Sequence, residues 1–433
     1  MKIIDLDAYQ IFDSRGNPTL EAEVVLEDGS IGHGLVPSGA STGQFEALEL
    51  RDGDERRFRG KSVERAVRHV QGEIAVRLRH ADAYDQAAID RALIALDGTV
   101  DKSRLGANAI LGVSMAAADA AARSRNVPLF EHLGGGAGKL IPLPEIQIIG
   151  GGAHANWQTD IQDYLVVPTG AKSLWEALEM TYNVYQTIGD LLTKAGQRFG
   201  VADEGGYWPQ FKRNCEPLEL LARAIELAGY APGTEVAISL DIAASDLYDA
   251  ATGLYSLRLE NRRFSSPEFA ELICGWIDQF PIIAVEDPMA DTDVDGWKEI
   301  SRRLAHRVLL VGDDLFVTNM QRISQGIDSS LANAVLIKLN QVGTVTETIE
   351  AIRATQQAGW LPIVSARSGE TEDAFISHLA VATNAGMLKV GSIVRGERTV
   401  KWNELLRIER RLGKASRFEG AKRLKRLTGQ RDR

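Results

Sequence analysis

Short apolar runs recur through the second half of this chain, and four of them carry a charged residue at the same place. VAISLD ends on Asp241, IIAVED carries Glu286, VLLVGDD carries Asp313 and AVLIKLN carries Lys338. Such runs, separated by amphipathic stretches at intervals of roughly 30 residues, are typical of consecutive βα units. Because strand C-termini in a closed parallel barrel meet at one mouth, the pattern predicts an active site there.

The three carboxylates point to a metal site. A single aspartate after a strand is more often a helix cap or a solvated loop residue. Here three acidic residues keep the same position relative to their strands, and a lysine shares it. Carboxylate oxygens without neighbouring Cys or His suit a hard divalent ion, and Mg²⁺ fits them better than Zn²⁺. We therefore expect Asp241, Glu286 and Asp313 to bind a divalent cation.

Two further runs add positive charge to the predicted mouth. LPIVSAR ends at Arg367, and MLKV holds Lys389. A lone lysine in a strand usually belongs to a structural ion pair, but the charged neighbours favour a role in catalysis. Between the runs, helical spacing predicts helices near 173–195, 218–228, 267–279, 344–357 and 373–384.

The first part of the chain has a different pattern. Lys2–Gln10 and Thr19–Glu27 alternate as strands do, whereas 62–79 and 108–123 have helical spacing. We expect a small α+β domain over residues 1–133, a flexible junction at GGGAG, a barrel domain over 140–410 and a basic tail over 411–433. The glycine runs fit neither a phosphate-binding loop nor a dinucleotide-binding turn.

Bulk properties agree with a two-domain enzyme. A chain of 433 residues exceeds what one hydrophobic core usually supports. A net charge of -10 argues against a general nucleic-acid binder. Lys and Arg crowd the end of the chain, and we interpret this end as a solvated or frayed tail, with an anionic partner as the alternative.

The cysteine content and the N-terminus bear on the compartment. The chain has 2 cysteines, which give no disulfide framework and fit a reducing environment. MKIIDLDAYQ is unlike a signal peptide, and no 18-residue apolar span occurs. We expect a cytoplasmic protein that does not insert into a membrane.

Long motifs place the chain near a known family. From about Tyr9 to Arg410 it resembles the enolases, on the strings DSRGNPT, VPSGASTG, EALELRDGD, LGANAILGVS, DEGG, EDP, VGDDLFVTN, IKLNQVGT, RSGETED and KWNELLRIE. The resemblance implies an α+β lid domain on a modified (β/α)8 barrel, in a homodimer or higher homo-oligomer. It also implies a glycolytic hydro-lyase that converts 2-phosphoglycerate, a small phosphorylated carboxylic acid, to phosphoenolpyruvate with two Mg²⁺.

The resemblance also implies roles for individual residues. Removing a proton next to a carboxylate creates a second negative charge, which two cations offset; enolase-superfamily sites are a named example of this chemistry. By position, the expected roles are metal ligands Asp241, Glu286, Asp313 and Ser41; general base Lys338; general acid Glu204, assisted by Asp163; and substrate contacts His154, Gln162, Arg367, Ser368, Lys389, Glu286 and Asp313. Plainer explanations are a flexible turn for Ser41, a structural role for His154 and a turn cap for Glu204.

Several positions depart from the family pattern. Ala366 replaces the histidine of SHRSGETED, Asp163 shortens the glutamate of QEF, and Gly150 replaces the asparagine of INGG. Further changes occur at Ala202, Val390 and Gly396. Three interpretations follow: an enolase proper, a specialised paralogue that dehydrates a modified phosphoglycerate in phosphonate or phosphinate biosynthesis, or a non-catalytic binding protein with this fold.

Overall fold

Eight strands close into a barrel in the order β11-β12-β13-β14-β15-β5-β6-β7. The structure is a computed structural model that describes residues 1–39 and 43–429. Strand β6 is antiparallel to both of its neighbours, β5 and β7, whereas the other pairs are parallel. The strands are β5 (Leu143–Gly150), β6 (Asp163–Val167), β7 (Ala237–Asp241), β11 (Ile282–Glu286), β12 (Leu309–Gly312), β13 (Ala334–Ile337), β14 (Leu361–Ser365) and β15 (Met387–Gly391). The expected modified (β/α)8 barrel is thus confirmed.

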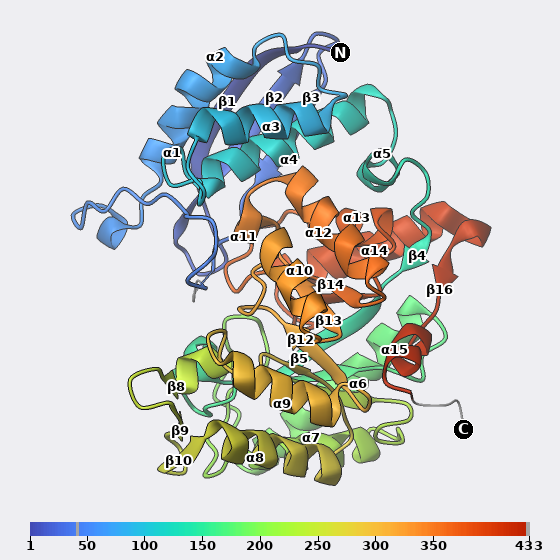
Figure 1. The fold of residues 1–433 in the computed structure, drawn as a ribbon. Helices are drawn as coiled ribbons and strands as arrows, with labels where there is room; N and C mark the ends of the chain where they lie inside the picture. The colour runs from blue at the N-terminus through green and yellow to red at the C-terminus, as the bar shows by residue number, and fades with distance from the viewer. Residues whose placement is uncertain (40–42, 430–433) are drawn as a thin grey trace.

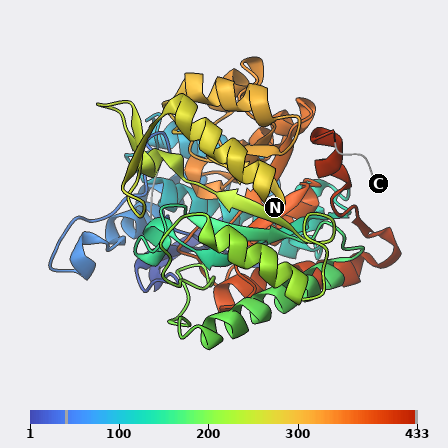
Figure 2. The ribbon, with the colours of Figure 1, turned by 90° about the horizontal axis from the view of Figure 1, so that it is seen from below.

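Helices cover the outside of this barrel (Figures 1 and 2). Side-chain caps fix where several of them begin: Ser173 accepts the Glu176 N–H at 3.1 Å, and Thr344 accepts the Glu347 N–H at 3.2 Å. The helices are α6 (Leu174–Lys194), α7 (Glu216–Leu227), α8 (Ser266–Gln279), α9 (Val294–Leu304), α10 (Met320–Asp328), α11 (Leu339–Val342), α12 (Val345–Gln357), α13 (Phe375–Ala382) and α14 (Gly396–Leu412). All five helices predicted in this region are present.

The N-terminal residues form an antiparallel sheet, β1-β2-β3, packed against helices (Figure 1). Sheet and helix approach closely at Gly34, where an added Cβ would lie 2.1 Å from the carbonyl oxygen of Gly112. The elements are β1 (Ile3–Phe12), β2 (Pro18–Leu26), β3 (Ile31–Leu35), α1 (Glu64–His69), α2 (Ala75–Leu78), α3 (Gln86–Asp97), α4 (Ala107–Ser124) and α5 (Leu129–Gly134). The two predicted strands correspond to β1 and β2.

Two predicted segments show local detail that the sequence pattern did not indicate. The helix expected over 62–79 is present over 64–78, but its middle turn, Val70–Ile74, is π-helical and contains Gly72, a weak helix former. The flexibility of the GGGAG junction stays a prediction, but two of its glycines, Gly134 and Gly138, lie against α13. An added Cβ at Gly134 would lie 2.6 Å from the Ala382 carbonyl oxygen, and one at Gly138 would lie 2.5 Å from the Val381 carbonyl oxygen. These glycines therefore allow close packing between segments.

The end of the chain closes the barrel at the face opposite the mouth. Strand β16 (Arg417–Phe418) pairs with β4 (Leu140–Ile141), and α15 (Lys422–Leu427) follows it. Leu424 is 1% exposed and packs with apolar residues from the barrel strands. A solvated or frayed tail is therefore wrong for the described part of this segment, because its apolar residues are needed in the core.

The remaining short elements are a small sheet, 3-10 turns and loops. They are β8 (Tyr248–Asp249), β9 (Leu254–Leu257), β10 (Arg262–Ser265) and the turns Phe58–Gly60, Gly152–Ala155, Ala244–Leu247 and Gly413–Ala415. Within residues 1–39 and 43–429, no helix combines the length and the apolar character that crossing a bilayer requires.

Candidate active site

The residues singled out in the sequence meet at one mouth of the barrel. Asp241 and Glu286 end strands β7 and β11, and Asp313 and Lys338 directly follow β12 and β13. One pocket is lined by His154, Gln162, Asp163, Glu204, Asp241, Asp313, Lys338, Arg367, Ser368 and Lys389. Glu286 is 2% exposed and contacts the lining residue Lys389. Ser41 falls outside the described residues, so its role stays a prediction.

The ammonium group of Lys389 contacts three acidic side chains at the barrel mouth. Its Nζ lies 2.8 Å from Asp241 Oδ2, 2.7 Å from Glu286 Oε2 and 3.9 Å from Asp163 Oδ2. Burial opposes the charge of the lysine, but these carboxylates raise its pKa well above the usual value. Burial also opposes ionisation of Asp241, yet Lys389 lowers its pKa, whereas burial and the charge of Asp241 raise the pKa of Glu286 well above normal. Of these two carboxyls, Asp241 therefore carries the negative charge more readily.

Lys338 is ion-paired to Asp313. Its Nζ donates to Asp313 Oδ2, while Gln341 Nε2 donates to Asp313 Oδ1 at 2.8 Å. Burial acts to lower the pKa of Lys338, but the Asp313 carboxylate outweighs burial and raises it. Thr318 Oγ1 accepts the Lys338 N–H at 2.9 Å and donates to Gln341 Oε1 at 2.6 Å. The direction of the lysine side chain is thus fixed by a hydrogen-bonded network.

Glu204 lines the same pocket, in the loop between α6 and α7. His154 Nδ1 is 4.0 Å from Glu204 Oε1. Burial acts to raise the pKa of Glu204, but the positive charge of Arg398 contributes most to lowering it below normal. The pKa of Asp163 is instead raised well above normal by burial and by the nearby Glu204 charge. A pair of neighbouring carboxyls pushed apart in this way is a frequent arrangement for acid–base chemistry.

Arg367 connects the mouth to the N-terminal part of the chain. Its Nη1 lies 2.8 Å from Glu46 Oε2 and 3.2 Å from Asn340 Oδ1. Ser368 Oγ accepts from Arg15 at 3.3 Å. A loop from the N-terminal region therefore covers the side of the pocket where a phosphate is expected. Ala366 lines the same pocket, and its N–H donates to the carbonyl oxygen of Lys389 at 2.9 Å.

The donor set fits a hard cation. Many acidic residues line the pocket, among them Asp163, Glu204, Asp241 and Asp313, and Glu286 contacts the pocket residue Lys389. Glu286 Oε1 is buried and accepts no hydrogen bond within the described part of the chain. A buried carboxylate oxygen without a donor is the kind of atom a divalent ion coordinates. Among the described residues, the oxygens of Asp241, Glu286 and Asp313 do not form one tight cluster, and Lys389 Nζ contacts the first two.

A tighter acidic cluster combines Asp313 with two residues that the sequence analysis did not single out. One oxygen each from Asp287, Asp313 and Asp314 lie within 4.8 Å of one another. Burial and the Asp313 charge raise the pKa of Asp314 to about 8. Asp287 accepts the N–H groups of Asp313 at 3.0 Å and of Asp314 at 2.8 Å. The adjacent acidic residues in the strings ED and GDD could have indicated this cluster from the sequence.

Two polar residues on β5 were also missed. Glu145 and Gln147 are 1% and 0% exposed in an otherwise apolar strand. Glu145 accepts a hydrogen bond from Ser239, and burial raises its pKa. Their spacing of two residues places both side chains on one face of the strand, and this spacing was the available signal.

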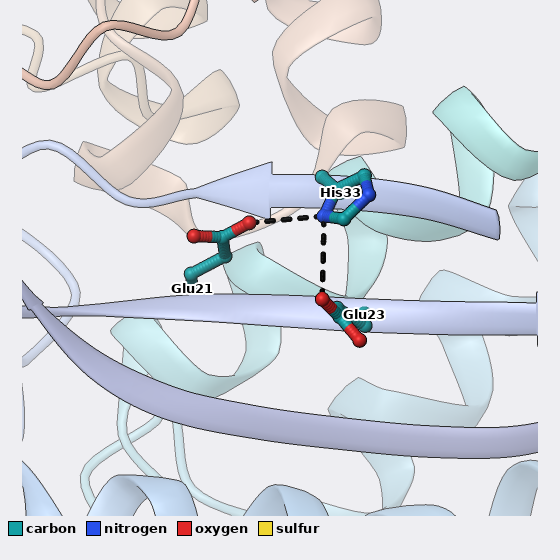
Figure 3. Close-up of side chains that lie close together, drawn as sticks. All are labelled: Glu21, Glu23 and His33. Atoms are coloured by element: carbon teal, nitrogen blue, oxygen red, sulfur yellow. Dashed lines mark hydrogen bonds and ion pairs between the residues drawn. The ribbon is translucent and has the colours of Figure 1, made fainter.

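A second cluster with possible metal ligands lies on the N-terminal sheet (Figure 3). His33 Nδ1, on β3, lies 2.9 Å from Glu21 Oε1 and 3.6 Å from Glu23 Oε1, both on β2. The Tyr9 hydroxyl donates to Glu23 Oε1 at 3.2 Å, and Asp119 Oδ2 accepts the backbone N–H of His33 at 3.0 Å. These contacts connect neighbouring strands to α4, and we assign the cluster a structural role.

Comparisons with known proteins agree with this geometry. Residues 3–133 match the family model described as the enolase N-terminal domain, and residues 138–427 match the enolase C-terminal TIM barrel domain. The chain is 53% identical over 418 residues to Enolase 1 of Desulfitobacterium hafniense (strain Y51). The aligned residues make up 96% of this chain and 95% of the relative.

Proposed function

Because this chain belongs to the enolase family and is a hydro-lyase of the EC 4.2.1.11 type, we propose that it dehydrates 2-phosphoglycerate to phosphoenolpyruvate. One observation carries the choice of substrate and residues. A lysine, Lys338, and a carboxyl, Glu204, line the same pocket, which also holds cationic groups at Lys389 and Arg367. A doubly anionic substrate could thus have a base and an acid within one enclosure.

The chain's own residues account for each proton. Lys338 Nζ takes the proton from C2 of the substrate, and the electrons of that C–H bond form the C2–C3 double bond. The C3–O bond breaks, and Glu204 donates the proton with which the hydroxyl leaves as water; the pKa of Glu204 is lowered and that of Asp163 is raised, so Asp163 is the group that supplies this proton to Glu204. Lys389 lies where it can bind the substrate carboxylate, and the fork of Arg367 suits phosphate oxygens, with Ser368 beside it. His154 and Gln162 complete the wall.

Mg²⁺ is the proposed cofactor, at two ions per site. Asp241, Glu286 and Asp313 would hold one ion, and Ser41 would contribute to the second. When bound, the ions would offset the negative charge that develops on the substrate carboxylate and, by engaging Asp313, weaken the ion pair that keeps Lys338 protonated. The orphaned Glu286 Oε1 is the structural support for this assignment.

The experiment is formation of phosphoenolpyruvate from 2-phosphoglycerate, followed by ultraviolet absorbance. We expect turnover that requires Mg²⁺ and stops with excess chelator. Lys338→Ala should lower kcat by about 10²-fold or more, the usual range for a general base. Turnover unaffected by chelator removes the metal from the mechanism, and full activity of Lys338→Ala removes the lysine from the role of base.

A specialised paralogue is the second candidate, and Ala366 is the observation that favours it. This residue lines the pocket where the family pattern has histidine, so the pocket lacks a donor and has more room. In that case wild-type turnover of 2-phosphoglycerate should be weak, and Ala366→His should raise it. An active wild type whose turnover Ala366→His does not improve argues for the enolase proper. Because the chain belongs to the enolase family, we do not propose the third interpretation, a non-catalytic binding protein.

We also propose a homodimer or higher homo-oligomer, supported by the family resemblance. Sedimentation velocity at micromolar concentration tests it, and a single monomeric species there contradicts it.

A further inference from the structure

Three positions that depart from the family pattern lie together. Gly150 pairs with Asp163 across strands β5 and β6. An added Cβ at Gly150 would lie 2.6 Å from the Cβ of Ala202 and 3.4 Å from Nε2 of Gln147. Contacts below 3 Å between such atoms are not tolerated, so an asparagine at 150 and an alanine at 202 exclude one another here. The departures are therefore parts of one rearrangement.

Gln147 lies at the centre of this group. Its Nε2 donates to Asp163 Oδ1, and its Oε1 accepts the N–H of Gly206 at 2.8 Å. The side chain is 0% exposed, so both halves of its amide are satisfied by protein groups alone. One side chain thus connects the strand that carries Asp163 to the loop that carries Glu204.

The loop itself is built for this contact. Ala202 N–H donates to the Gly206 carbonyl at 2.7 Å, which closes a tight turn around Glu204. An added Cβ at Gly206 would lie 2.7 Å from Gln147 Oε1, so the glycine lets the amide reach the backbone. On the other side, the Ser392 N–H donates to the Glu204 carbonyl at 2.9 Å. The position of Glu204 therefore depends on Gln147 as well as on its own turn.

We infer that Gln147 is a positioning residue for the dehydration, matched in length to the shortened acid Asp163. Because the family pattern has glutamate at 163, the aspartate leaves one methylene less on that side, and the buried glutamine reaches across to it. Gln147 acts through Asp163 and the Glu204 loop and does not touch the substrate. The inference rests on the proposed function, whose proton donor is Glu204.

A length exchange tests this. Wild type, Gln147→Asn, Asp163→Glu and the double variant are assayed with 2-phosphoglycerate at saturating Mg²⁺. We expect each single variant to lose roughly tenfold or more in kcat with KM changed less than about threefold, and the double variant to recover most of the loss. Asp163→Glu restores the family residue, so it would leave kcat unchanged if positions 147 and 163 acted independently.

Gln10→Asn is the control, because Gln10 is a half-buried glutamine outside the pocket lining whose amide oxygen also connects two segments, accepting from Ser62 Oγ and the Val63 N–H at 2.9 Å each. It should change stability and leave kcat unaltered. Urea unfolding of all five proteins in chelator gives a readout that does not depend on turnover.

The outcomes separate the two ideas. Single-variant losses in kcat that simply multiply in the double variant overturn the inference, as does coupling seen in unfolding alone, which would make the pair merely structural. If the wild type fails to convert 2-phosphoglycerate, the proposed function and the positioning role both fail. The length match between Gln147 and Asp163 is then tested by unfolding: coupling between the two substitutions supports the match, and absence of coupling overturns it.

Discussion

The ammonium group of Lys389 lies 2.7 Å from the carboxylate of Glu286, with both side chains buried at the centre of the barrel mouth. The same ammonium contacts Asp241 at 2.8 Å. One positive charge therefore lowers the pKa of Asp241 and limits the rise that burial causes in the pKa of Glu286. This relationship makes the stability of the protein sensitive to a single side chain.

Replacing Lys389 with methionine should destabilise the protein in chelator by about 3–5 kcal/mol at neutral pH, because it leaves buried acids without a counter-charge. The loss should grow as pH rises, since a carboxyl whose folded pKa is raised above its unfolded value holds a proton that it must give up. Urea midpoints at several pH values measure this effect. Lys298→Met, which breaks an exposed pair with Asp295 at 3.2 Å, is the control, and an equal loss there would contradict the prediction.

Gly150→Asn, which restores the family residue, should destabilise the protein by about 1–3 kcal/mol because the pocket behind it is filled. The atom in the way is the Cβ of Ala202, 2.6 Å from the added Cβ. Ala202→Gly in the same protein should therefore recover much of the loss, while Ala202→Gly alone has a small effect. Chemical unfolding of the three variants measures it, and a double variant no better than Gly150→Asn would show that the contact is not the cause.

Asp373 predicts a pH dependence of stability away from the mouth. Burial raises its pKa to about 7, with Lys401 acting in the opposite direction. Because the folded pKa lies above the unfolded value, stability from this group is full below the unfolded pKa and is lost as pH rises toward about 7. Asp373→Asn should flatten the decrease in unfolding free energy between these values. An unchanged slope would mean that the carboxyl is ionised in the folded protein.

Leu424→Ala should lower the unfolding free energy by about 2–5 kcal/mol, the usual cost of emptying a buried leucine site. The residue is 1% exposed and packs against the ends of the barrel strands at the face opposite the mouth. Lys422→Ala, at an exposed position of the same helix, should change stability by much less. Urea unfolding compares the two, and equal effects would indicate that α15 is not docked in solution.

The sequence alone was sufficient for the barrel and for the residues at its mouth. Strands buried on both faces appear as continuous apolar runs, and a charge at the end of each run must lie at the mouth once parallel strands close. This reasoning placed Asp241, Glu286, Asp313 and Lys338 together without any knowledge of packing. Such predictions succeed because periodicity and chain direction are local properties.

Only the tertiary structure decided which groups face one another. Strand β6 runs antiparallel, so Asp163 opens its strand at the mouth instead of closing it. Glu46 reaches Arg367 across 321 residues of sequence, and Gln147 bridges Asp163 and Gly206. These partners are selected by long-range packing, which a local pattern does not encode, because each contact depends on where distant segments come to rest.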